Sequence, residues 1–408
     1  MVPSIQRFTF LPTWIPVLVP TWIPVLVLIW ILVPTTSPGV AQEQADYVPQ
    51  AGILAPIEKG RYIAGELIYV DAVNRRGAVR LHGDENGRYW SGPPHYFALL
   101  PYAAVWRNGA RGELRDLPLG THVHGTFFVP PKGEENVIPP LPDEHQRLAV
   151  PHNHAICLED DFSFYQRRGQ SWKILSIDIE KEKINVEPAG RKTKDGFNTP
   201  RAFDIDPRTR VWKDRRLSDL TDIKIGATVQ LNLTWAANWG QKEFRVGDVW
   251  LDDASRKFAT EMQRRTHLRY ERQRWTAGWI DRVEPFDFGG GLVTLTLFEV
   301  DREIIEDLRK DKDERIAVAV AENTRRTWIH RSDRKFAKLV EWKDLKNPPQ
   351  GSAGVQLRLK FVELLSGYKP GRCVRVKAES WKWVSVPPEE RITSQAEQEQ
   401  GARMVLPF

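Results

Sequence analysis

The sequence predicts a mainly β protein that consists of three small barrels in a row. Two observations favour this fold class. Short segments alternate apolar and polar residues with a period of two and are separated by Gly, Pro and Asp, as in half-buried antiparallel strands. In addition, one residue pattern recurs along the chain. The length of 408 residues suits two or three domains, and 16 Trp residues give thin cores large apolar side chains.

The recurring pattern is clearest in residues 97–123 and 203–229. In both stretches a Phe and an aliphatic residue two positions later precede a Pro, a Val-Trp pair, a Leu-x-Asp-Leu motif and a Gly-x-x-Val motif. We expect Leu-x-Asp-Leu to form a short helical turn that its Asp caps. The matching positions are Phe97, Leu99, Pro101, Val105, Trp106, Leu114, Asp116, Leu117, Gly120 and Val123, and then Phe203, Ile205, Pro207, Val211, Trp212, Leu217, Asp219, Leu220, Gly226 and Val229.

A lead-in segment precedes each copy of the pattern. It has two aliphatic residues three positions apart, closed by an acid, and it starts at Leu67, Ile174 and Ile280. A second alternating segment follows each lead-in. Repeats of about 70 to 110 residues are too long for solenoid units and fit small self-contained barrels.

The third copy is looser than the other two. It has alternating aliphatic residues from Ile316, then Trp342-Lys343-Asp344-Leu345 and Val355. It also carries an inserted segment, residues 299–315, which is rich in helix formers and is predicted to be a helix.

This pattern resembles families of exported bacterial domains of unknown function that are described as OB-like barrels. Their pattern reads Gly-x-φ-x-x-Val-Asp, an alternating strand, Leu-x-Asp-Leu and Gly-x-x-Val. Residues 65–123 match it best, residues 174–229 match without the first Gly, and the third copy begins at Gly278. The resemblance covers about half of the chain. Its motifs are structural, so it implies three tandem OB-like small β-barrels and transfers no active site.

Linkers and a helix are predicted between the barrels. Residues 129–151 hold many prolines and are predicted to form an extended connector, whereas residues 252–275 have a capping Asp252, good helix formers and no Pro or Gly. We expect this helix to pack only at its start, because arginines continue its apolar face. The predicted order is a signal peptide at 1–41, barrels at 58–130, 167–235 and 275–384, a Pro-rich and His-containing linker at 131–166, a connector with a basic helix at 236–274, and a disordered tail at 385–408.

The first 41 residues predict export. Arg7 is the only charged residue before a long apolar run, and small residues follow the run up to Ala41, as in a secretory signal cleaved after Ala41. An uncleaved membrane anchor is the alternative, but four prolines interrupt the run. We therefore expect a protein of the periplasm, cell envelope or extracellular space, with membrane contact only through an uncleaved signal.

The two cysteines, Cys157 and Cys373, leave two alternatives open. In an oxidising compartment they form one disulfide, or they remain two separate buried thiols. No Cys-x-x-Cys motif indicates redox chemistry.

Two His-x-His pairs are the candidate metal ligands. On a strand, residues two apart point to the same side, so His122 with His124 and His152 with His154 each offer two imidazoles, with Glu159, Asp160 or Asp161 to complete the site. Zinc is the metal we expect of such ligands. In the alternative interpretation His122 and His124 lie on the solvent face, because Val123 points inward, and His152 and His154 are ordinary loop residues.

The predicted connector helix is a candidate anion-binding surface. The chain has a net charge of +6, and this helix is basic. A polyanion could lie along Arg264, Arg265, Arg269 and Arg272. The alternative is a solvated connector whose charges pair within the helix.

The sequence contains none of the common catalytic motifs, such as Gly-x-Ser-x-Gly or a metalloprotease helix, so it identifies no catalytic residue. We expect an exported, non-catalytic binding or scaffolding protein of the cell envelope that engages glycans, another anionic polymer or envelope proteins. Two alternatives stay open: a metal-binding protein or metal-dependent hydrolase that uses the four histidines, and a nucleic-acid binder that uses an OB face.

Overall fold

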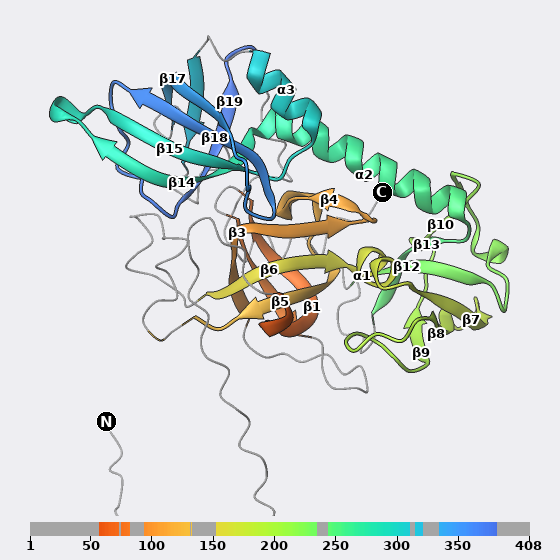
Figure 1. Cartoon of the computed structure of the whole chain (residues 1–408). Coiled ribbons are helices and arrows are strands. Elements are labelled where there is room, and N and C mark those ends of the chain that lie inside the picture. The colour runs from red at the N-terminus through yellow and green to blue at the C-terminus, as the bar shows by residue number, and fades with distance from the viewer. Residues whose placement is uncertain are drawn as a thin grey trace, which may run out of the picture. The chain divides into compact units, whose positions relative to one another are not determined.

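The chain folds into three closed small β-barrels, which confirms the predicted fold class (Figure 1). The computed structural model describes residues 57–72, 75–81, 94–130, 132, 152–234, 244–310, 315–320 and 334–381. Each barrel has its own cluster of buried apolar side chains. Within these ranges no helix is both long and apolar enough to cross a membrane.

Barrel 1 is a six-stranded sheet in the order β2-β1-β5-β6-β3-β4 that closes through pairing of β2 with β3. Its strands pair antiparallel except β3 and β6, which run parallel. The elements are η1 (Ile57–Lys59), β1 (Arg61–Asp71), β2 (Arg76–Leu81), β3 (His95–Arg107), β4 (Ala110–Gly112), η2 (Leu114–Asp116), β5 (His122–Phe128) and β6 (Asn153–Asp160), followed by the helix α1 (Asp161–Arg167).

Barrel 2 repeats this arrangement. Its sheet has the order β11-β10-β13-β12-β7-β8-β9 and closes through the parallel pairing of β13 with β9. The elements are β7 (Gln170–Asp178), β8 (Lys183–Gly190), β9 (Arg201–Asp204), β10 (Arg210–Lys213), β11 (Arg216–Ser218), η4 (Leu220–Asp222), β12 (Thr228–Thr234) and β13 (Arg245–Trp250), followed by the helix α2 (Asp253–Arg274).

Barrel 3 closes differently. Its ring is β14-β15-β18-β17-β16-β19, and every pair in it is antiparallel. The insertion between its second strand and the rest contains the predicted helix, which is confirmed as α3. The elements are β14 (Thr276–Pro285), η5 (Asp287–Gly289), β15 (Gly291–Phe298), α3 (Arg302–Lys310), β16 (Arg315–Ala319), β17 (Arg334–Asp344), β18 (Ser352–Phe361) and β19 (Cys373–Ala378).

All three barrels share one framework around their first strand. The register of β1, β7 and β14 shifts by one residue directly after an aliphatic residue, which is a β-bulge at the same place in each copy. The carbonyl of that residue accepts a hydrogen bond from a glycine with positive φ, a conformation that glycine adopts at little cost. The pairs are Gly120 with Leu67, Gly226 with Ile174 and Gly371 with Ile280, at N···O distances of 2.8, 2.8 and 2.9 Å.

This framework confirms the helical turn of the first copy and corrects the alignment of the second. In barrel 1 the turn is η2, and the carboxylate of Asp116 accepts from the backbone N–H of Glu113 at 2.7 Å. In barrel 2 the turn is η4, which begins at Leu220, so the match is Leu220-Thr221-Asp222-Ile223 and not Leu217 to Leu220. The side chain of Asp219 therefore makes no cap hydrogen bond.

The third copy also needs a new alignment. Its Gly-x-x-Val motif is Gly371 to Val374 at the start of β19, whereas Trp342 and Val355 lie on β17 and β18. The inserted α3, β16 and β17 separate the first two strands of the barrel from β18 and β19. The spacing of the motifs along the sequence therefore differs from that in the other two copies.

Two predicted boundaries were wrong for the same reason. Residues 153–166 are not linker, because β6 closes barrel 1 and α1 follows it. Likewise β13, placed in the connector at 236–274, closes barrel 2. In both barrels the recognisable repeat ends at Gly-x-x-Val, one strand before the barrel is complete.

The predicted connector helix is confirmed as α2, with the side chain of Asp252 accepting from the N–H of Ser255 at 2.7 Å. The expectation that it packs only at its start is wrong. Its buried stripe continues to the last turns but is largely polar, so an apolar pattern could not indicate it. The stripe consists of Ser255, Ala259, Gln263, His267 and Glu271.

Cys157 and Cys373 are free, buried thiols that pack in different apolar clusters, so the two-thiol alternative holds. The predicted signal peptide (1–41), most of the Pro-rich linker and the tail (385–408) lie outside the described residues.

Candidate metal centre

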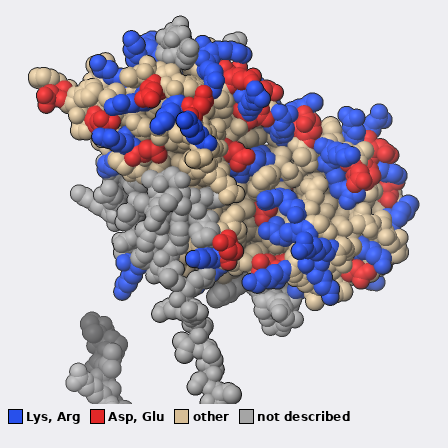
Figure 2. Space-filling model, in the orientation of Figure 1, with Lys and Arg blue, Asp and Glu red and all other residues tan. Residues whose placement is uncertain are grey.

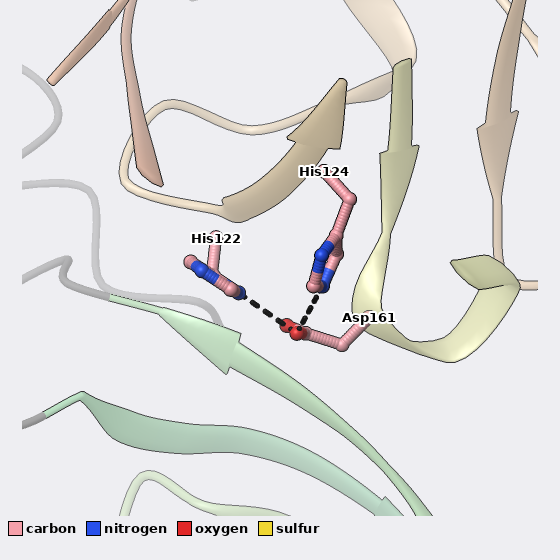
Figure 3. A group of neighbouring side chains, drawn as sticks. All are labelled: His122, His124 and Asp161. Carbon is pink, nitrogen blue, oxygen red and sulfur yellow. Dashed lines mark hydrogen bonds and ion pairs between the residues drawn. The ribbon is translucent and has the colours of Figure 1, made fainter. Parts of the chain in front are cut away.

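Two histidines of β5 and the first residue of α1 meet at the joint between barrels 1 and 2 (Figure 3). His122 and His124 are two positions apart on a strand, so their side chains share one face. The neighbouring strand β6 ends at Asp160, and the next residue, Asp161, begins α1. Because Asp160 caps this helix by accepting from the N–H of Ser163 at 2.8 Å, it fixes where Asp161 projects.

The three side chains converge on one carboxylate oxygen. The Nδ1 of His122 lies 2.8 Å from Oδ1 of Asp161, and the Nε2 of His124 lies 2.9 Å from the same oxygen. All three residues are at most 1% exposed. The alternative that placed both histidines in solvent is therefore wrong. Val123 does point into the core of barrel 1, but Phe197 and Phe244 of barrel 2 pack against His122 on the other face of β5.

Two further groups form hydrogen bonds to His124 and Asp161 on the sides that face away from their mutual contact. The hydroxyl of Tyr62, on β1, lies 2.6 Å from Nδ1 of His124, the nitrogen that faces away from Asp161. The second carboxylate oxygen of Asp161 accepts from the backbone N–H of Leu233, on β12, at 2.9 Å. Such partners fix the orientation of an imidazole and a carboxylate before any ligand binds.

Aromatic rings enclose the group. Phe164 of α1 stacks on His124 with ring centroids 3.8 Å apart and an interplanar angle of 11°. Phe197 stacks on His122 at 5.7 Å, and Phe244 lies 4.5 Å from the same imidazole. The polar group therefore sits in an apolar shell, where each electrostatic interaction is stronger than in water.

Burial and the contacts within the group together set the protonation of His124 and Asp161. Burial lowers the pKa of His124 to about 4, against the opposing effect of Asp161. Burial alone raises the pKa of Asp161, but the adjacent His122 and the hydrogen bonds from both imidazoles outweigh it and hold that pKa below its ordinary range. A neutral imidazole and an ionised carboxylate are the forms that bind metal ions.

The group lies within a network that joins the two barrels. The side chain of Asn232, on β12, accepts from the N–H of Phe162 at 2.8 Å and donates to Asp160 at 2.9 Å. Next to it, Thr121 and Thr234 form a backbone bridge between the barrels. The candidate site is thus part of an interface and not of an open cleft.

The second pair of predicted ligands lies elsewhere. His154 pairs with Phe128 in the sheet, four positions along β5 from His124, or about 13 Å at the usual rise of a strand. His152 contacts the ring of Tyr96. Among the described residues the four histidines therefore do not form one site, and the group of possible metal ligands consists of His122, His124 and Asp161.

Of the three acids proposed as further ligands, only Asp161 reaches the imidazoles. Glu159 forms ion pairs with Arg167 and Arg168, and Asp160 caps α1. Sequence reasoning missed Tyr62 altogether, because 62 positions separate it from His124 and only the closure of barrel 1 brings them together.

The four arginines of the predicted anion site line a groove of about 430 Å³ along α2. Acids of the α3 segment occupy much of it: Arg264 pairs with Asp301 at 2.8 Å, and Arg272 with Asp307 at 3.1 Å. Arg265 pairs with Glu261 of its own helix, whereas Arg269 makes no ion pair within the described part of the chain. The groove is therefore close to neutral, as in the connector alternative.

Comparison with protein families, with curated proteins and with solved structures finds no match to this chain.

Proposed function

We propose that this protein binds one divalent transition-metal ion of the zinc type through His122, His124 and Asp161, and that the ion holds barrels 1 and 2 together. The observation that carries the proposal is the meeting of three ligand atoms within 4.8 Å of one another in a fully buried site. Two imidazoles and one carboxylate are a frequent donor set for zinc.

The donors and their surroundings fit such an ion. Zinc binds imidazole nitrogen at about 2.0–2.1 Å, so the two histidines need to part from the carboxylate by only a few tenths of an ångström. With Nε2 of His124 on the metal, its Nδ1–H donates to the hydroxyl of Tyr62, and Asp161 keeps its bond from Leu233.

The second barrel indicates that the frame itself does not require these residues. There, the two residues that flank the matching Val229 are Thr228 and Gln230, and the barrel closes without histidine. The acid at the start of its following helix, Asp253, is exposed and pairs with Arg256. The buried His-His-Asp group is thus particular to the first joint, which favours a role beyond packing.

A buried ion at a joint has a structural role. It stabilises the folded state by mass action, in proportion to the logarithm of its concentration over its dissociation constant. We place this centre in an exported, non-catalytic binding or scaffolding protein of the cell envelope, as the signal-like start of the chain and the tandem barrels favour.

The test is the metal content of the purified protein by mass spectrometry after expression with zinc. We expect about one zinc per chain, and a loss of that zinc in His122→Ala and in Asp161→Asn. His152→Ala removes a histidine outside the group and serves as the matched control, with unchanged zinc. Zinc retained in both site variants would refute the proposal.

A further inference from the structure

A second surface, on barrel 2, carries a cluster of basic side chains that few acids oppose. Figure 2 shows Lys and Arg side chains gathered on this part of the molecule, over α1 and the strands β8 and β9. We call it the barrel 2 basic patch. It consists of Arg167, Arg168, Arg191, Lys192, Lys194 and Arg201.

The backbone holds these residues together. The segment between β8 and β9 folds against α1, because the N–H of Phe197 donates to the hydroxyl of Tyr165 at 2.9 Å. The N–H of Arg191 donates to the carbonyl of Gly169, directly after α1, at 3.1 Å. The cations of the helix and of the segment therefore form one continuous surface.

Few acids oppose this charge. Glu159 is buried beneath the patch and forms ion pairs with Arg167 and Arg168. Asp195 is the only acid among residues 191–201. The side chains of Arg191, Lys192 and Lys194 are exposed and make no hydrogen bond or ion pair within the described ranges. This separates the patch from the α2 groove, where acids of α3 neutralise the arginines.

The patch offers charge with little free stacking surface, because arginines already cover its aromatic rings. Arg168 lies 3.8 Å from the ring centre of the buried Phe164, Arg201 lies 5.0 Å from that of the buried Phe197, and Arg167 lies 4.1 Å from that of the half-buried Trp106. Binding of single-stranded nucleic acid relies on exposed aromatic rings for its bases. An anionic polysaccharide needs only spaced cations for its carboxylates.

We propose that the barrel 2 basic patch binds an anionic polysaccharide that carries carboxylate groups. This site borders the candidate metal centre, because Arg168 and Arg201 lie over the rings of Phe164 and Phe197, but it uses none of the three metal ligands. Exposed and unpaired lysine and arginine side chains make the contacts, so binding weakens as salt screens the charges.

The experiment measures binding of the full chain to a soluble polyuronate by fluorescence titration at about 50 and 200 mM salt. The variant Arg191→Ala/Lys192→Ala/Lys194→Ala removes the three unpaired cations. Its matched control is Lys181→Ala/Arg302→Ala/Lys310→Ala, which removes the same charge from side chains that are 80%, 90% and 74% exposed and lie outside the patch.

We expect the patch variant to lose affinity by at least about tenfold and the control by less than about twofold. Circular dichroism checks that both variants keep the fold. Equal losses in the two variants, or no binding of the unaltered protein at the lower salt, would overturn the site. An oligothymidylate that binds more tightly than the polyuronate, and loses that affinity in the patch variant, would overturn the polysaccharide and indicate nucleic acid.

Discussion

The two helices that leave barrels 1 and 2 begin alike and join their barrels differently. Both start with Asp-Asp-x-Ser, at residues 160–163 and 252–255, and in both the first Asp caps the helix through the N–H of the Ser. After α1 begins, the second Asp is buried against two histidines. At α2 the corresponding Asp253 is 83% exposed at its side chain.

The difference begins with the strand before each helix. β6 runs up to and includes its capping Asp160, whereas β13 ends at Trp250, two residues before Asp252. The earlier turn at barrel 1 directs Asp161 toward the side chains of β5. The cap is thus common to both helices, whereas the burial of the second Asp is found only at the first of these two joints.

The largest expected effect comes from changing the second Asp at each joint. Asp161→Asn removes the charge of the carboxylate that both buried imidazoles contact. Each hydrogen bond to a charged group contributes about 1.5–3 kcal/mol, so we expect a loss of about 3–5 kcal/mol in the free energy of unfolding. Asp253→Asn changes an exposed side chain, and we expect less than about 0.5 kcal/mol. Denaturant titration of both variants measures the contrast. Similar losses in the two variants would mean that the two acids have the same role and that the joints do not differ in this respect.

Zinc binding should distinguish the two joints by a smaller change in the free energy of unfolding. At a free zinc concentration about 100 times its dissociation constant, the unaltered protein should gain about 2.7 kcal/mol over the protein in chelator. Asp253→Asn should gain as much, whereas His122→Ala should gain nothing. Thermal unfolding with zinc and with chelator measures this. An unaltered protein that responds no more than His122→Ala would leave the group as a hydrogen-bonded joint only.

The sequence predicted the framework better than the joints. Period-two alternation and the repeat indicated three barrels, because the bulge and the glycine turn follow from local residues such as Leu67 and Gly120. The closing strands β6 and β13 lie beyond the repeat and were assigned to linkers. Their role depends on parallel pairing with a distant third strand, which no local pattern reports.

The candidate site shows the same division. His122 and His124 were predicted from their spacing, and Asp161 was one of three acids considered. The choice among the acids depended on the cap at Asp160, and the contact of Tyr62 depended on closure of the barrel. The repeated Asp-Asp-x-Ser was the signal that could have singled out Asp161.

The second joint has polar chemistry of its own, which is sensitive to pH. His267, in the buried stripe of α2, lies 3.0 Å from a carboxylate oxygen of Asp116 in barrel 1. Burial alone lowers the pKa of His267, but the hydrogen bond to Asp116 and the charges of Glu271 and Glu113 outweigh it, so its pKa is raised. Arg115 also faces this group and pairs with Glu271 at 3.3 Å.

A raised pKa in the folded state means that folding favours the protonated imidazole. The stability that His267 contributes is therefore complete below the pKa of the unfolded chain, about 6.5, and is lost as pH rises through the folded pKa. Unfolding free energies measured from about pH 6 to 9 should fall over this range in the unaltered protein. In His267→Gln this component of the pH dependence should be absent, while His152→Ala should keep it. A pH profile that is the same in His267→Gln as in the unaltered protein would show that the contact with Asp116 does not couple α2 to barrel 1 through a proton.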